Sequence, residues 1–175
     1  MSDHLFEYIE PLVLAAKGRT LSGSLPLSRL NRLDQLLIEA KGAAEVSLHF
    51  TRDEAGQPCV VGHATATLQL ECQRCMQAMA WPVRVDFRLG IVTSPGAAEQ
   101  LPDEYDPLLV TGEGISVADI VEDELILALP IVAMHETHEC PAQEMLLGLK
   151  AEAAAVTEKE NPFAVLAQLK KDSND

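Results

Sequence analysis

Apolar and polar side chains alternate in three successive segments of the central sequence, and this alternation restricts the fold more than any other feature. The segments lie at 46–51, 64–70 and 83–89. Successive side chains of a β-strand point to opposite faces, so a period of two predicts strands with one buried face. The connections between the segments are short. Together these features predict an antiparallel β-meander around residues 44–92.

Helical spacing precedes this meander. Four apolar residues recur every three or four positions, namely Leu30, Leu33, Leu37 and Ala40. They predict a helix near 28–41, which Ser28 can cap and Gly42 can end. A shorter helix is expected from Pro11, a favourable first position, to Gly18.

A second long helix is expected after the meander, near 116–129, with Ser116 at its start. Five apolar residues can face the core: Val117, Ile120, Val121, Leu125 and Ala128. Three acidic residues are expected to face outward: Asp119, Glu122 and Asp123. The predicted fold class is therefore α+β, an antiparallel β-meander packed by helices.

The 175 residues are enough for one domain with a substantial core. We expect this single α+β domain to span residues 1–150. Residues 151–175 are expected to form an acidic, loosely ordered C-terminal tail. The tail carries one short amphipathic segment, in which Phe163, Leu166 and Leu169 form an apolar stripe.

Negative charge is concentrated in the second half of the chain. Residues 1–90 hold nine Lys or Arg and ten Asp or Glu, whereas residues 91–175 hold four and seventeen, within a total net charge of −14. Phosphate backbones repel a chain this acidic, so any contact with nucleic acid has to use the first half. The second half is better suited to basic protein partners, or simply to solubility.

Five arginines of the first half could contact RNA phosphates: Arg29, Arg32, Arg74, Arg84 and Arg88. The alternative is that they belong to ordinary solvated surfaces. Aromatic residues make up only 4% of the chain, which argues against a platform for stacking bases.

The sequence favours a cytoplasmic protein. It has no run of about 18 apolar residues of the kind that spans a membrane. Its first residues do not resemble a secretory signal. Four cysteines without such a signal fit a reducing compartment better than a disulfide framework.

Cys72 and Cys75 form a Cys-x-x-Cys motif in the connection between two predicted strands. Both thiolates can then point at one ion, as in a zinc knuckle. The remaining ligands would come from His135, His138 and Cys140, about 60 residues later. The alternative is that the cysteines are small apolar turn residues and that no cofactor binds.

Enzymatic readings have less support. A redox Cys-x-x-Cys pair lies where a strand enters a helix, whereas a strand is expected after this pair. A thiol oxidoreductase is therefore the weakest hypothesis. The histidines of "HETHE" are three residues apart, not the four that a zinc-protease helix requires. We expect no catalytic residues.

Several segments together resemble the YceD family, the large ribosomal RNA subunit accumulation proteins. They are "GSLPLSRLNRL", "LQLECQRCMQAMAWPV", "VEDELILALPIVAMHETHEC" and the terminal "NPFAVLAQLK". They follow the family's order and span nearly the whole chain. "CQRC" and "NPFAVL" are the most specific of them.

The resemblance implies a cytoplasmic, non-enzymatic factor in ribosome biogenesis that supports synthesis, processing or accumulation of large-subunit (23S) ribosomal RNA. Ribosomal or rRNA-processing proteins are the implied partners, and direct contact with rRNA stays open. The family's cysteine pair falls on Cys72 and Cys75, with Arg74 between them. Its later His/Cys segment falls on His135 and Cys140. The alternative hypothesis is an RNA-binding zinc-knuckle module.

Overall fold

The computed structural model describes residues 7–112 and 114–143. The chain divides into two units, residues 1–134 and 135–175. The first unit contains every helix and strand discussed in this section. The predicted boundary at residue 150 and the tail that follows it lie outside the described residues, so both stay predictions.

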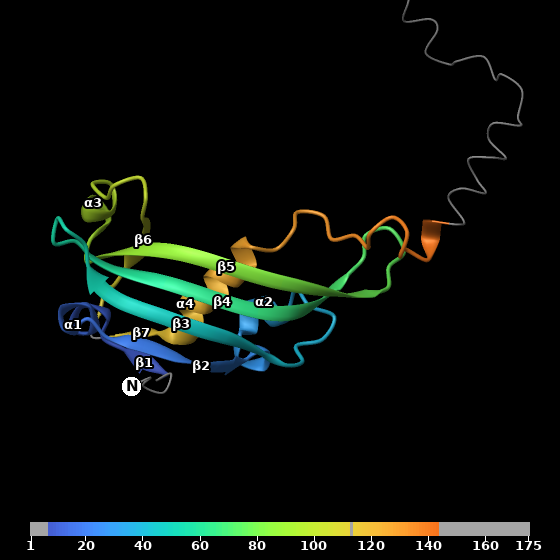
Figure 1. Ribbon diagram of the computed structural model, residues 1–175, viewed down its shortest axis with the longest axis horizontal. Coiled ribbons are helices and arrows are strands. Elements are labelled where there is room, and N and C mark those ends of the chain that lie inside the picture. The colour runs from blue at the N-terminus through green and yellow to red at the C-terminus, as the bar shows by residue number, and fades with distance from the viewer. Residues whose placement is uncertain (1–6, 113, 144–175) are drawn as a thin grey trace, which may run out of the picture. The chain divides into compact units, whose positions relative to one another are not determined.

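The first unit is built on a five-stranded sheet with the order β2-β3-β4-β5-β6 (Figure 1). Its strands are β2 (Thr20–Pro26), β3 (Ala43–Arg52), β4 (Pro58–Glu71), β5 (Ala78–Val92) and β6 (Asp106–Leu109). The first four pair antiparallel with their sequence neighbours, which confirms the meander. Strand β6, by contrast, runs parallel to β5.

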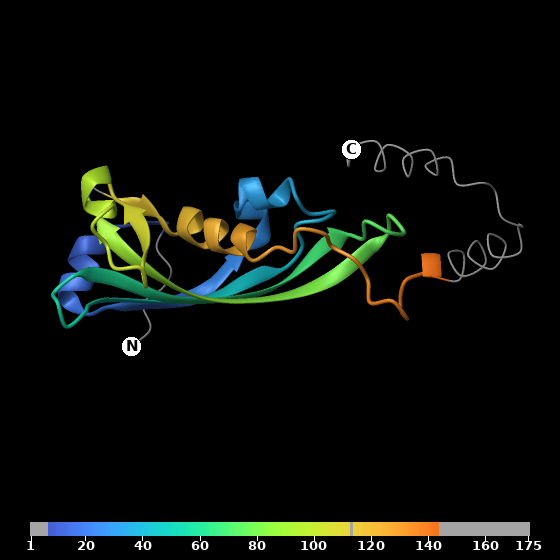
Figure 2. The ribbon, with the colours of Figure 1, turned by 90° about the horizontal axis from the view of Figure 1, so that it is seen from above.

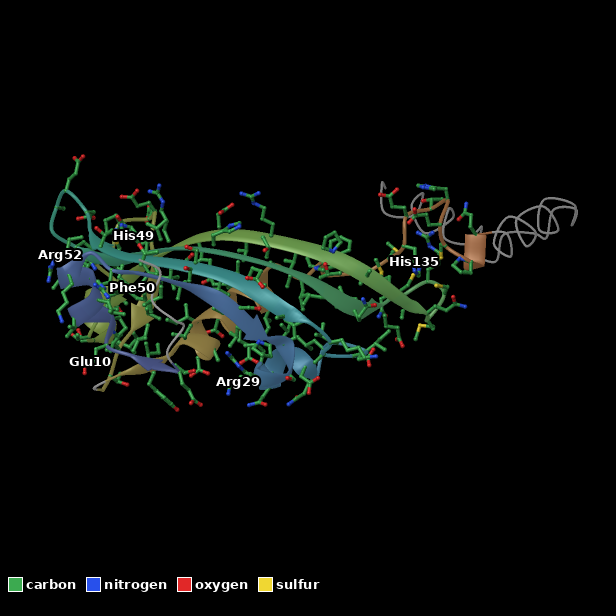
Figure 3. All side chains as sticks on the ribbon, turned by 60° about the horizontal axis from the view of Figure 1, so that its bottom comes forward. Glu10, Arg29, His49, Phe50, Arg52 and His135 are labelled. Carbon is green, nitrogen blue, oxygen red and sulfur yellow. The ribbon has the colours of Figure 1, made fainter. Side chains whose placement is uncertain are left out.

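One face of this sheet carries the core. Leu48 of β3 lies opposite Gly62 of β4, which lies opposite Phe87 of β5. Leu48 and Phe87 are buried. A Cβ atom at Gly62 would lie 2.0 Å from the Phe87 ring, so this close approach requires glycine. His49 and Phe50, successive residues of β3, divide between the exposed face and the core (Figure 3). The predicted period of two therefore sorts polar from apolar residues correctly.

Helix α4 (Val117–Leu127) confirms the second predicted long helix. It lies on the same face of the sheet as the short helix α2 (Asn31–Asp34) (Figure 2). Ser116 caps it, because its Oγ accepts a hydrogen bond from Asp119 N at 3.4 Å. The predicted apolar face is buried at Val117, Ile120, Val121 and Leu125, and half-buried at Ala128.

The outward placement of Glu122 was wrong. Its exposed fraction is 4%, whereas Asp119 and Asp123 are exposed as expected. Glu122 Oε1 accepts hydrogen bonds from Arg32 N at 2.6 Å and from Leu33 N at 3.1 Å. Glu122 Oε2 accepts another from Arg32 Nε at 2.7 Å. The carboxylate can be buried because α2 supplies these donors.

The predicted helix at 28–41 was also wrong. The chain forms a 3₁₀ turn, η1 (Leu27–Arg29), then α2, and then irregular turns. Ile38 N donates to Gln69 O at 2.8 Å, and Glu39 bridges Gln69. Strand β4 extends beyond its pairing with β3, so its last residues have spare backbone groups. Pairing with these groups stops the helix, and only Leu30 and Leu33 of its expected apolar stripe are fully buried.

Several smaller elements complete the first unit. Helix α1 (Pro11–Lys17) is confirmed, and Gly18 ends it in the left-handed region with φ 59°. Helix α3 (Pro95–Ala98) follows β5, and the Oγ of Ser94 accepts a hydrogen bond from Ala97 N at its start. Strands β1 (Tyr8–Ile9) and β7 (Ile115–Ser116) form a separate two-stranded sheet. None of the described helices is long and apolar enough to cross a membrane.

Candidate metal centre

A tight turn between β4 and β5 holds Cys72 and Cys75. Cys72 N donates to Gln77 O at 2.9 Å, and Met76 N donates back to Cys72 O at 2.8 Å. Met76 adopts φ 58°, in the left-handed region, which reverses the chain. The two Sγ atoms lie within 4.8 Å of each other, and neither is in a disulfide. The turn therefore presents two thiols to one point, as a zinc knuckle requires.

The chain that follows α4 returns to this turn within the first unit. Gln73 N donates to Ala133 O at 2.8 Å, and Arg74 Nη2 lies 3.7 Å from Met134 Sδ. Ala133 and Met134 are thus held beside the two cysteines. His135 follows Met134 by a single peptide bond.

The described part of the second unit, residues 135–143, carries the later ligand candidates. A ring nitrogen of His135 and the Sγ of Cys140 lie within 4.8 Å of each other. Two backbone hydrogen bonds shape this segment, from Glu139 N to Glu136 O at 3.0 Å and from Gln143 N to Cys140 O at 2.9 Å. Cys140 is buried.

Four of the five predicted ligands belong to two such pairs, Cys72 with Cys75 and His135 with Cys140, and each pair offers donors that zinc prefers. His138 is not in this group. Its ring is exposed, and its two nitrogens lie 3.7 Å from the carboxylates of Glu136 and Glu139. The fourth cysteine, Cys59, is elsewhere on β4, where burial raises the pKa of its thiol.

Arg74 gives this donor set a matching charge. Its Nη1 is buried and has no hydrogen-bond partner in the part of the chain that the structure describes. Three thiolates and a neutral imidazole around Zn²⁺ carry a net charge of about −1. Arg74 lies between Cys72 and Cys75, so a guanidinium without a full set of acceptors sits on the turn that would carry this negative charge. The donor set fits zinc.

The other predicted arginines do not share one surface. Arg32 is bound by Glu122 and, through Nη1 at 2.7 Å, by Asp123. Arg84 and Arg88 are exposed on the polar face of the sheet, 3.7 Å from Asp86 and 3.6 Å from Glu104. Arg29 is exposed on η1 (Figure 3). Nearby carboxylates thus offset three of the five positive charges.

Comparison with known proteins agrees with the sequence pattern. The family model of the large ribosomal RNA subunit accumulation protein YceD matches residues 60–170, which include all four candidate ligands. The large ribosomal RNA subunit accumulation protein YceD of Haemophilus influenzae is 34% identical over 165 residues, 93% of this chain and 94% of that protein. The chain belongs to the YceD family. No solved structure gives a significant match to this YceD-family chain.

Sequence reasoning missed one residue of interest in this chain, Glu124 on α4. Its exposed fraction is 9%, and the described residues offer it no hydrogen bond or ion pair. Helical spacing alone could have shown that it lies beside Ile120, Val121 and Leu125. The absence of a partner depends on distant segments of this fold, and no local sequence signal reports it.

Proposed function

We propose that this protein is a cytoplasmic, metal-stabilised assembly factor that supports accumulation of large-subunit ribosomal RNA. The observation that carries this proposal is membership of the YceD family, with a relative that matches 93% of the chain. The role in the family's name describes a cellular outcome. The chemistry of the described residues suggests how this chain would contribute to it.

Zinc would be held by Cys72, Cys75, His135 and Cys140. In support, the Sγ atoms of Cys72 and Cys75 lie within 4.8 Å of each other, and so do a ring nitrogen of His135 and the Sγ of Cys140. The hydrogen bonds of Gln73 and Arg74 to Ala133 and Met134 anchor the chain one residue before His135. The entropic cost of closing the loop between Gln73 and Ala133 is therefore met within the first unit, one peptide bond before His135.

The metal would have a structural role. Four protein ligands fill a tetrahedral zinc site, which leaves no open position for water or substrate. When bound, the ion would tie the turn after β4 to the chain that follows α4. The proposed function is accordingly that of a binding protein and not an enzyme.

Basic ribosomal or rRNA-processing proteins are the partners that best fit the charge of this chain. Its net charge is −14, which repels phosphate and attracts positively charged proteins. Arg32, Arg84 and Arg88 already lie within 4 Å of carboxylates, so little unopposed positive charge remains for RNA.

Ribosome profiles test the proposed function. Cells that lack this protein should show reduced large-subunit rRNA relative to small-subunit rRNA. Wild-type protein should restore it, and C72S/C75S should restore it less well. The matched control is Cys59→Ser, a buried cysteine that is not a proposed ligand. Normal large-subunit levels in the deleted cells would contradict the proposal.

Direct RNA binding is the second candidate function. The observation that favours it is the exposure of Arg84 and Arg88 on the same face of β5. RNA binding that weakens with salt and is lost in R84A/R88A would support this alternative. Binding that the double variant leaves unchanged would exclude this arginine pair as the contact.

A further inference from the structure

A cavity of about 690 Å³ is lined by residues of β3, β4, β5, β6 and α4, and four of its ten lining residues are acidic. Four acidic residues contribute to it from three parts of the first unit: Asp86, Glu104, Asp106 and Glu124. His63 and Arg88 also line it. The cavity therefore gathers more negative than positive charge, although its residues are far apart in sequence.

Two of these carboxylates have partners. Asp86 Oδ1 lies 2.6 Å from His63 Nδ1, and Glu104 lies 3.6 Å from Arg88. The other two, Asp106 and Glu124, have no hydrogen bond from a side chain and no ion pair among the described residues. After these pairings, the excess negative charge of the cavity therefore resides on Asp106 and Glu124.

Glu124 is the more unusual of the two, because it is nine-tenths buried and unpaired. Burial raises its pKa, and the charges of Asp106 and Asp123 raise it further. Its carboxylate oxygens are not fully buried, since Arg74 Nη1 is the only fully buried polar side-chain atom without a partner among the described residues. They are partly desolvated and open to the cavity, so a donor placed there would stabilise them. A cationic ligand would supply such a donor in charge-assisted hydrogen bonds.

The form of this cation follows from two observations. In the described part of the chain, the cysteine and histidine group is the only one with metal-ligand spacing, so the cavity carboxylates are not gathered around a single ion. An ammonium or guanidinium group, which is larger and carries several N–H donors, suits more widely spaced carboxylates.

The edge of β5 that faces away from β4 can receive a polypeptide. Strand β6 pairs only with residues 89–92 of β5, and no described strand pairs with this edge over 78–88. We call residues 78–88 the free edge. Asp86 and Arg88 belong to it and also line the cavity. An added strand would place alternate side chains on the cavity side.

We propose that Asp106 and Glu124 bind a Lys or Arg side chain of a basic polypeptide that pairs with the free edge of β5. This inference rests on the proposed function and deepens it, because it names the surface and chemistry through which a basic partner is held. It requires no contribution from the metal site.

A peptide titration tests the inference on the full-length protein. The probe is the capped peptide Thr-Val-Thr-Arg-Thr-Val-Thr, and its control replaces arginine with citrulline, which is uncharged and nearly isosteric. Saturable changes in the NMR signals of Asp106, Glu124 and residues 78–88 are expected with the arginine peptide. Glu124→Gln or Asp106→Asn should weaken binding by about tenfold or more, since each removes a charge-assisted contact.

Asp103→Asn is the matched control variant, because Asp103 is exposed and close in sequence but does not line the cavity. It should bind the arginine peptide within about twofold of wild type. Three results would overturn the inference: no binding by wild type, equal binding of the citrulline peptide, or equal weakening by Asp103→Asn. A melting curve for each variant shows that it is folded.

The cellular assay separates this inference from the proposed function. If the deletion lowers large-subunit rRNA and Glu124→Gln restores it fully, the proposed function stands and this surface is not used. If the deletion has no effect, the proposed function fails, whereas the peptide result still decides whether the surface binds basic chains.

Discussion

Helix α4 carries two buried glutamates only two residues apart, and their surroundings differ completely. Glu122 faces α2 and accepts three hydrogen bonds from Arg32 and Leu33. Burial pushes its pKa up, but the hydrogen bonds from Leu33 and Arg32 outweigh this and leave the pKa below its usual value. Glu124 faces the cavity at β5, and burial with nearby acids raises its pKa.

The difference shows that burial alone does not reveal what a carboxylate does. The donors around Glu122 make it a structural link between α2 and α4, complete within the protein. Glu124 is also buried but has no such donors among the described residues, and its carboxylate oxygens are open to the cavity. We expect variants at the two positions to affect stability with opposite signs.

The largest effect is expected for Glu122→Ala. This change leaves the backbone N–H of Leu33 without its acceptor and the Arg32 side chain without its closest carboxylate. The free energy of unfolding should fall by about 3 kcal/mol, the lower end for breaking a buried pair, because Arg32 is half exposed. Urea denaturation measures it, and a loss below about 0.5 kcal/mol would contradict the structural role.

Metal removal should have the next largest effect, and it acts away from both glutamates. A ligand that binds only the folded state stabilises it by about 2.7 kcal/mol at a hundredfold excess over its dissociation constant. A chelator should therefore lower the melting temperature of wild type but not that of C72S/C75S. Equal behaviour of these two proteins, with no zinc found by metal analysis, would exclude the site.

Glu124→Gln should raise stability by about 1 kcal/mol, because an amide avoids the cost of burying a charge. The melting temperature at neutral pH measures this gain. Glu122→Gln, the same chemical change two residues earlier, should instead lower it. A loss of stability in both variants would show that Glu124 has a structural partner after all.

The pH dependence should show the same contrast with smaller differences. The folded-state pKa of Glu124 is raised above its usual value of 4.5. The stability that Glu124 contributes to the folded protein is therefore fully present below pH 4.5, and it is lost as pH rises through the folded-state pKa. The advantage of Glu124→Gln over wild type should therefore grow as pH rises above 4.5.

Glu122 should show the reverse trend. The folded-state pKa of Glu122 is lowered below its usual value of 4.5. The stability that Glu122 contributes to the folded protein is therefore fully present above pH 4.5, and it is lost as pH falls through the folded-state pKa. The loss of stability in Glu122→Gln, relative to wild type, should therefore shrink in acid.

The charged groups that face Glu124 are Asp106 on β6 and Asp123 on α4. Denaturation curves of both variants and wild type at several pH values measure these differences in stability. The same pH trend in Glu122→Gln and Glu124→Gln would contradict the prediction.

Much of the fold could be predicted because its signals are local. Alternation over 46–89 defines three strands and their buried face, since side-chain direction in a strand depends only on position. Ser116 and the apolar spacing after it define α4 in the same way. The helix at 28–41 could not be predicted correctly, because Gln69, 31 residues after Ile38, competes for the backbone of Ile38.

The candidate site likewise has a part that local sequence predicts and a part that depends on contacts between distant segments. Two residues between Cys72 and Cys75 in a strand connection predict a knuckle, because covalent geometry keeps their thiols close. The return of Ala133 to Gln73 joins segments 60 residues apart, and no spacing rule could predict it. His138 has the right chemistry but lies beside Glu136 and Glu139 instead.

The sequence by itself therefore determined the strands, the buried face of the sheet, the cysteine pair and the family, because each depends on neighbouring residues or on their order. Only the tertiary structure decided the roles of Glu122 and Glu124. Their donors, or the lack of them, depend on segments such as Arg32, 90 residues from Glu122. A carboxylate's free energy depends on which polar groups surround it in space, and that arrangement exists only once the chain has folded.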